Sequence, residues 1–92
     1  MQGTGGKAGW GIQVGAFKDD APARKAASKA AKQLQKKVRK NAQVVVVPVQ
    51  QGDEMIYRAR LVGLSRNGAT EACRRLQSKK QSCVPVPPGS ME

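Results

Sequence analysis

The sequence predicts one α+β domain with the element order βαββαβ, built on a four-stranded antiparallel sheet. Three observations lead to this prediction: two strand-like runs that each lead into a helical pattern, a β-branched run and a turn between them, and a length of 92 residues, enough for one modest core. Two strand-helix-strand units joined by a hairpin favour packing of both helices on one face of the sheet. In the usual strand order 4-1-3-2, the first and third strands are central neighbours, and the other face stays open.

The first strand is predicted over residues 10–17, where apolar and other residues alternate. One face is apolar and comprises Trp10, Ile12, Val14 and Ala16. The opposite face comprises Gly11, Gln13, Gly15 and Phe17. Residues 1–9 are rich in glycine and lack periodicity, so we expect a flexible leader over residues 1–9, a folded domain over residues 10–87 and a tail over residues 88–92.

The first helix is predicted to run from Asp19 or Asp20, either of which can cap it, to about Lys40. Apolar side chains recur at helical spacing and form its inward face, at Ala23, Ala27, Ala30, Leu34 and Val38. The opposite face carries lysines, at Lys25, Lys29, Lys32 and Lys36. We interpret these lysines as a solvated face, which is the usual role of such a run.

Residues 42–50 are rich in valine and predict a strand buried or nearly buried on both faces, with Pro48 indicating a sheet edge. Residues 51–53 (Gln-Gly-Asp) predict a turn. The third strand is then predicted from Met55 to about Leu64. Its alternation places one set of residues on the core side, namely Tyr57, Ala59 and Leu61. The other side carries Ile56, Arg58, Arg60 and Val62.

The second helix is predicted to begin after Ser65, whose side chain can cap it. Its inward face comprises Ala69, Ala72, Cys73 and Leu76. Residues 82–86 predict a short last strand, which prolines confine to a sheet edge and end, at Pro85, Pro87 and Pro88.

The chain is strongly basic, with 17 Lys and Arg against 6 Asp and Glu and a formal charge of +11. Such a charge attracts a polyanion, whether nucleic acid, an anionic membrane surface or an acidic polymer. No apolar run approaches the roughly 20 residues that span a bilayer, so we expect no membrane insertion. The sequence has no histidine and 2 cysteines, which excludes a common four-ligand zinc site, and we expect no metal and no cofactor.

Catalysis is not expected of this chain. It has no histidine, no paired carboxylates in an apolar setting and no Ser-x-x-Lys nucleophile motif, which Ser78-Lys79-Lys80 does not satisfy. The sequence therefore favours a binding module over an enzyme.

Two segments, in this order, resemble the SPOR family of bacterial cell-envelope modules. Residues 10–17 (Trp-Gly-Ile-Gln-Val-Gly-Ala-Phe) are similar to the family's opening strand, with its Gln-hydrophobic-Gly/Ser-small-Phe core. Residues 57–64 (Tyr-Arg-Ala-Arg-Leu-Val-Gly-Leu) are similar to its Tyr-Arg-Val-Arg third strand. The resemblance covers about residues 9–87. With Ala72-Cys73 and Cys83, it looks closest to the C-terminal module of alphaproteobacterial D-alanyl-D-alanine carboxypeptidases.

The resemblance implies a domain that binds peptidoglycan, prefers glycan strands denuded of stem peptides, and targets a periplasmic parent protein to the division septum. The family's glycan surface is the open sheet face. The positions that match give the glycan-binding residues as Gln13, Gly15, Ala16, Arg58 and Arg60, and Ile56 is added at a position where some members carry an aromatic ring. A periplasmic setting also favours a disulfide between Cys73 and Cys83 over two buried thiols. We expect a monomer whose partner is the glycan strand.

The chemistry of these residue types suits a sugar polymer. The amide of Gln13 both donates and accepts hydrogen bonds, as hydroxyl and N-acetyl groups require. The guanidinium groups of Arg58 and Arg60 suit the lactyl carboxylate of N-acetylmuramic acid, which remains when the peptide is removed. The simpler interpretation of all three is an exposed, solubilising sheet face.

Two other classes of function remain open from the sequence. RNA-recognition motifs share this strand order and bind single-stranded nucleic acid on the open sheet face, and a charge of +11 suits phosphate. That family needs aromatic residues on the two central strands, where this chain has Ile56, Arg58 and Arg60, so no nucleic acid is expected. A third possibility is a protein-interaction module that acts through the basic first helix.

Overall fold

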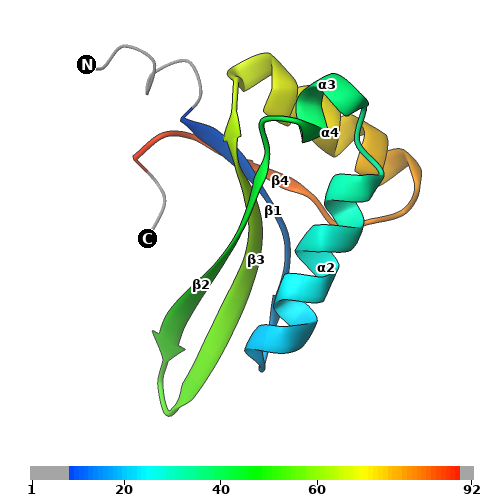
Figure 1. The fold of residues 1–92 in the computed structure, drawn as a ribbon. Coiled ribbons are helices and arrows are strands. Elements are labelled where there is room, and N and C mark those ends of the chain that lie inside the picture. Colours follow the sequence, from blue (N-terminus) through cyan, green and yellow to red (C-terminus); the bar gives the residue numbers. More distant parts are fainter. Residues whose placement is uncertain (1–8, 90–92) are drawn as a thin grey trace.

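The computed structural model describes residues 9–89, which form a four-stranded antiparallel sheet with helices on one face (Figure 1). Its strands and helices are β1 (Trp10–Phe17), α2 (Asp20–Lys32), α3 (Lys36–Arg39), β2 (Gln43–Gln51), β3 (Glu54–Leu64), α4 (Arg66–Ser78) and β4 (Val84–Val86). The strand order is β2-β3-β1-β4, which confirms the predicted order and places β1 and β3 at the centre. Most of the predicted leader and residues 90–92 of the predicted tail lie outside the described residues.

The core lies between the sheet and the two long helices. Ile12 of β1 and Leu61 of β3 face each other and are both fully buried. From the helices, the buried residues are Ala23, Ala27, Ala30, Ala69, Ala72, Cys73 and Leu76. The predicted inward faces of both helices are therefore confirmed for α2 and α4. Because most of these side chains are small, the helices can approach the sheet closely, and the core remains thin.

The strict alternation predicted for the first strand is correct as far as Val14, which packs against the core, and wrong from Gly15 onward. Gln13 lies opposite Arg60, but Gly15 lies opposite Ala59, so Val14 is an extra residue that forms a β-bulge. A shift of one residue moves every later side chain to the other face. Gly15 therefore lies on the helix-covered face.

The chain beyond the bulge follows the shifted register. Ala16 lies opposite Arg58 on the open face, and Phe17 lies opposite Tyr57 on the covered face. Both Phe17 and Tyr57 pack against the core. Each of the residues after the bulge, Gly15, Ala16 and Phe17, therefore lies on the face opposite to the predicted one.

The first helix is shorter than predicted. It ends at Lys32, and after Leu34 the chain takes an extended conformation at Gln35 before the single turn of α3. Contacts from distant segments hold this break: the Arg75 Nε donates to the Gln33 carbonyl oxygen at 2.6 Å, and the Gln81 Nε2 donates to the Gln33 Oε1 at 2.7 Å. A helical pattern in the sequence could not reveal these partners.

The strand β2 is an edge strand, as Pro48 indicates, but it is not buried on both faces. Its valines are half-buried. Val44 and Val46 pack against the core, whereas Val45 and Val47 lie opposite Arg60 and Arg58 on the other face. The prediction is wrong because no second layer within the described residues covers that face.

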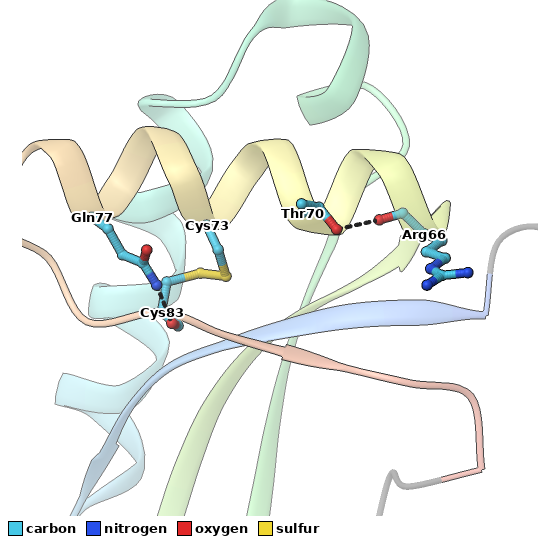
Figure 2. The surroundings of a disulfide bond; sticks show 5 residues. All are labelled: Arg66, Thr70, Cys73, Gln77 and Cys83. Atoms are coloured by element: carbon cyan, nitrogen blue, oxygen red, sulfur yellow. Dashed lines mark hydrogen bonds between the residues drawn. A yellow bond between two sulfur atoms is a disulfide. The ribbon is translucent and has the colours of Figure 1, made fainter.

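The last strand begins at Val84, two residues later than predicted. Cys83 precedes it and is joined to Cys73 of α4 by a disulfide (Figure 2). Gln77, one turn further along the same helix, donates from Nε2 to the Cys83 carbonyl oxygen at 2.9 Å. The backbone of Cys83 is thus bound to the helix, and the β-ladder starts only at the next residue. At the other end of α4, the Ser65 Oγ accepts from the Gly68 amide at 2.9 Å, which confirms the predicted cap.

Candidate functional site

The face of the sheet opposite the helices is the candidate site, and the strand register determines which side chains it carries. Residues directly opposite each other in antiparallel strands project from the same face. One row across the sheet consists of Val84, Gln13, Arg60 and Val45. The next row consists of Ala16, Arg58 and Val47. We call these two rows the open face.

Gln13 and Arg60 form the centre of the open face. The Arg60 Nε donates to the Gln13 Oε1 at 3.0 Å, joining the two central strands through their side chains. Arg60 is 4% exposed, whereas Gln13 is half-buried. Because the amide oxygen of Gln13 accepts from Arg60, its NH₂ group points elsewhere, and it has no protein partner within residues 9–89. Arg60 therefore orients an amide whose donors remain available.

Arg58 lies one row further along β3, on the same face as Arg60. Its neighbours across the sheet are Ala16, which is exposed and short, and Val47, which is apolar. Arg58 is half-buried and forms no ion pair or side-chain hydrogen bond with the described residues. A guanidinium in this position can donate in a bidentate manner to a planar carboxylate.

Valines from the two outer strands flank these polar groups. Val84 of β4 is 58% exposed beside Gln13, and Val45 and Val47 of β2 lie beside the arginines. Sequence reasoning missed all three as site residues. The signal for Val45 and Val47 was present, since an edge strand beside the third strand must contribute alternate side chains to the open face. The position of Val84 on the open face could not be predicted from the sequence, because it depends on the register of β4 with β1.

Two of the predicted site residues lie elsewhere. Gly15 is on the covered face, where a Cβ would come within 2.9 Å of Cε1 of Phe17, so the glycine makes room for that ring. Ile56 is on the open side but lies opposite Val49, in a third row near the β2–β3 hairpin. The structure thus brings together Gln13, Ala16, Arg58 and Arg60, and Ile56 lies at the margin.

The open face carries hydrogen-bond donors and apolar side chains, both of which can contact a ligand. Its side chains are an amide, guanidinium groups, valines and an alanine, with no carboxylate, thiol or imidazole to move a proton or attack a substrate. Across residues 9–89 there is no group of three or more His, Cys, Asp or Glu that could hold a metal ion. No helix in this range is long and apolar enough to cross a membrane.

Comparisons with known proteins agree with this picture. A family model described as the SPOR domain matches residues 6–87. The crystal structure of the RlpA SPOR domain from Pseudomonas aeruginosa is similar in fold, with a TM-score of 0.68 and 21% sequence identity over 87% of this chain and 100% of that chain. No curated protein matches this chain. The chain therefore belongs to the SPOR domain family, whose members are non-catalytic modules that bind peptidoglycan.

Proposed function

We propose that this domain binds peptidoglycan glycan strands on its open face and prefers strands from which the stem peptides have been removed. The observation that carries the proposal is the pairing of Gln13 with Arg60, residues 47 positions apart that meet at 3.0 Å between the central strands. This pairing leaves amide donors on the sheet surface. Donors of this kind suit the hydroxyl and N-acetyl carbonyl oxygens that repeat along a glycan strand.

The preference for denuded strands follows from charge. A stem peptide is attached to the lactyl group of N-acetylmuramic acid through an amide, which is neutral. Removal of the peptide leaves a carboxylate, and a carboxylate forms a stronger, charge-assisted hydrogen bond with a guanidinium. Arg58 forms no ion pair with a carboxylate among the described residues. We therefore assign the contact with the lactyl carboxylate to Arg58.

The apolar parts of the sugar rings require a different surface. All three aromatic residues of the chain, Trp10, Phe17 and Tyr57, pack against the core, so none supplies a stacking platform. Val84 and Val47 take this role in our proposal, since a sugar ring can lay its C–H groups against branched aliphatic side chains. The same lack of aromatic residues speaks against base stacking, and hence against single-stranded RNA as the ligand.

In the cell we propose that the module, over residues 10–87, acts as a monomer in the periplasm. Denuded glycan is enriched at division septa according to the family resemblance, so binding would concentrate a parent cell-wall protein there. A D-alanyl-D-alanine carboxypeptidase is the parent that we propose, on the resemblance of residues 57–64 and the cysteine positions.

The experiment is co-sedimentation of the domain with purified sacculi, before and after amidase treatment. We expect more wild-type protein in the pellet with amidase-treated sacculi than with untreated sacculi. The Arg58→Ala variant should pellet equally with both. The matched control is Arg24→Ala, which removes the same charge from the helical side, where Arg24 pairs with Asp20 at 3.2 Å. A Gln13→Ala variant should weaken binding to both forms of sacculi, because sugar hydroxyls are present in both.

The outcomes separate the proposal from its rivals. Equal binding to treated and untreated sacculi would contradict the preference for denuded strands. If Arg24→Ala and Arg58→Ala lose binding equally, net charge alone attracts the protein and the open face is not the site. Displacement of the domain from sacculi by single-stranded RNA, in a salt-dependent manner, would favour nucleic acid instead.

A further inference from the structure

The helical side of the molecule carries a second surface that glycan binding does not use. Exposed lysines lie there on α2, on α3 and at the C-cap of α3, namely Lys25, Lys29, Lys32, Lys36, Lys37 and Lys40. We call this set the lysine face. The lysines of α2 lie opposite the alanines that pack on the sheet, so they are directed away from the open face.

Within the described part of the chain, no acidic side chain forms an ion pair with a lysine of the lysine face. The only ion pairs there are Arg24 with Asp20 and Arg74 with Glu71, and neither involves these lysines. Like charges also stand at i,i+4 spacing at Lys25 and Lys29, an arrangement that disfavours a helix. Interspersed charges of both signs avoid a large field of one sign, whereas the lysine face carries a single sign over two elements.

The lysine face also lacks large apolar side chains. The exposed large hydrophobic residues in the described range are Met55 and Val84, which lie on β3 and β4. A partner of this surface must therefore be held by charge and not by an apolar anchor. It must also present many negative charges over a wide area, since the lysines extend along α2 and around α3.

We propose that the lysine face binds the surface of an anionic phospholipid bilayer, so that the open face is directed away from the membrane. Lysine suits this role because its ammonium group is a point charge on a flexible stem, which can reach mobile headgroups without fixed geometry. Each such residue near an anionic membrane adds to the attraction, and the attraction falls within a Debye length.

An acidic peptide is the less favoured partner. The groove beside the lysine face has an apolar floor that includes Leu34, Val38 and Ala72. However, Glu71 also lines it, Arg74 is paired with Glu71 at 3.6 Å, and Arg75 donates to the Gln33 carbonyl oxygen. The groove therefore contains one negative group and arginines that already have partners, which is a poor match to carboxylates.

The test is flotation of the domain with vesicles of equal parts phosphatidylcholine and phosphatidylglycerol, compared with phosphatidylcholine alone. We expect binding to the anionic vesicles only, at low salt and, more weakly, at about 0.15 M salt. Lys29→Gln/Lys32→Gln should reduce the partition coefficient at low salt by roughly thirtyfold. The matched control, Lys18→Gln/Arg66→Gln, removes the same net charge from outside the lysine face and should reduce it much less.

Three results would overturn the proposal. The first is no binding to anionic vesicles even at low salt, and the second is an equal loss in both double variants, which would show attraction by net charge alone. The third is binding to soluble polyglutamate that anionic vesicles do not compete for, which would favour an acidic protein partner. A circular dichroism melt of each variant confirms folding, and the vesicle assay contains no glycan, so it is independent of the sacculus experiment.

Discussion

Gly15 and Ala59 face each other across the two central strands, on the side covered by the helices. The bulge at Val14 puts the glycine there, and the ring of Phe17 occupies the space that a side chain at Gly15 would need. The same bulge keeps Gln13 and Ala16, which are three positions apart in the chain, on the same open face. A strand without it would point one of them into the core.

Gly15→Ala should therefore affect stability and not glycan contact. The new Cβ would lie 2.9 Å from Cε1 of Phe17, so the ring must shift within the core. We expect a loss of about 1–3 kcal/mol in the free energy of unfolding, measured by urea denaturation. Glycan binding of the folded fraction should remain. A variant of normal stability with lost binding would instead return Gly15 to the ligand surface.

The disulfide between Cys73 and Cys83 should stabilise the fold, because it closes a loop of sequence separation 10. Replacing both cysteines by alanine should lower the free energy of unfolding by about 2–3 kcal/mol, measured under oxidising conditions. The wild-type protein should lose a similar amount on reduction with dithiothreitol, and the double variant should not respond to it. Unchanged stability of the wild type in reductant would contradict this prediction.

The disulfide also bears on binding. Cys83 directly precedes β4, a strand of 3 residues that carries Val84 beside Gln13. Loss of the bond should loosen β4, so the reduced protein should bind denuded glycan more weakly at temperatures where it remains folded. Sedimentation with amidase-treated sacculi, with and without dithiothreitol, measures this effect.

Val84→Glu should weaken glycan binding with little effect on stability. Val84 is 58% exposed, so the polar replacement need not be desolvated, but it places a negative charge beside Gln13 on the open face. That charge repels a lactyl carboxylate. We expect a greater loss on denuded strands than on strands with peptides, and Val84→Leu, the matched control, should retain binding. Equal behaviour of the two variants would exclude a contact at β4.

Arg75→Ala tests the break between α2 and α3. The Arg75 Nε holds the Gln33 carbonyl oxygen, which no helical bond satisfies. Its loss should reduce stability by about 1 kcal/mol, since the bond is charge-assisted but lies at the surface. Arg74→Ala is the control, because its pair with Glu71 is largely exposed and such pairs contribute little. Equal thermal shifts in both variants would argue against a structural role of Arg75.

Much of this architecture follows from local patterns in the sequence. The buried faces of α2 and α4 follow from apolar spacing, since Ala23, Ala27, Ala72 and Leu76 recur with the helical period. The cap at Ser65 and the edge position of the strand with Pro48 follow from the chemistry of single residues. The βαββαβ order then restricts the sheet to few topologies, and the predicted strand order is the observed one.

The candidate site could be predicted only in part. Alternation along β3 placed Arg58 and Arg60 on the open face, and the strand order placed Gln13 beside them. Alternation along β1 failed after Val14, because a bulge depends on how two strands pair and not on the pattern within one. Val84 joined the site through the pairing of β4 with β1, which are distant in sequence, whereas Val45 follows from the β2–β3 hairpin and could have been predicted.

Local sequence periodicity thus sufficed for the order of the strands and long helices and for the buried faces of α2, α4 and β3, because each of these depends on residues within a turn or a strand. Interactions between residues far apart in the sequence determine where α2 ends and which face of the sheet Gly15 occupies. Arg75 and Gln81 end α2 at a point where its own pattern would continue, and pairing with β3 sets the face of Gly15. The end of α2 and the face of Gly15 depend on atoms that only folding brings together. The sequence around each of these positions therefore does not predict them.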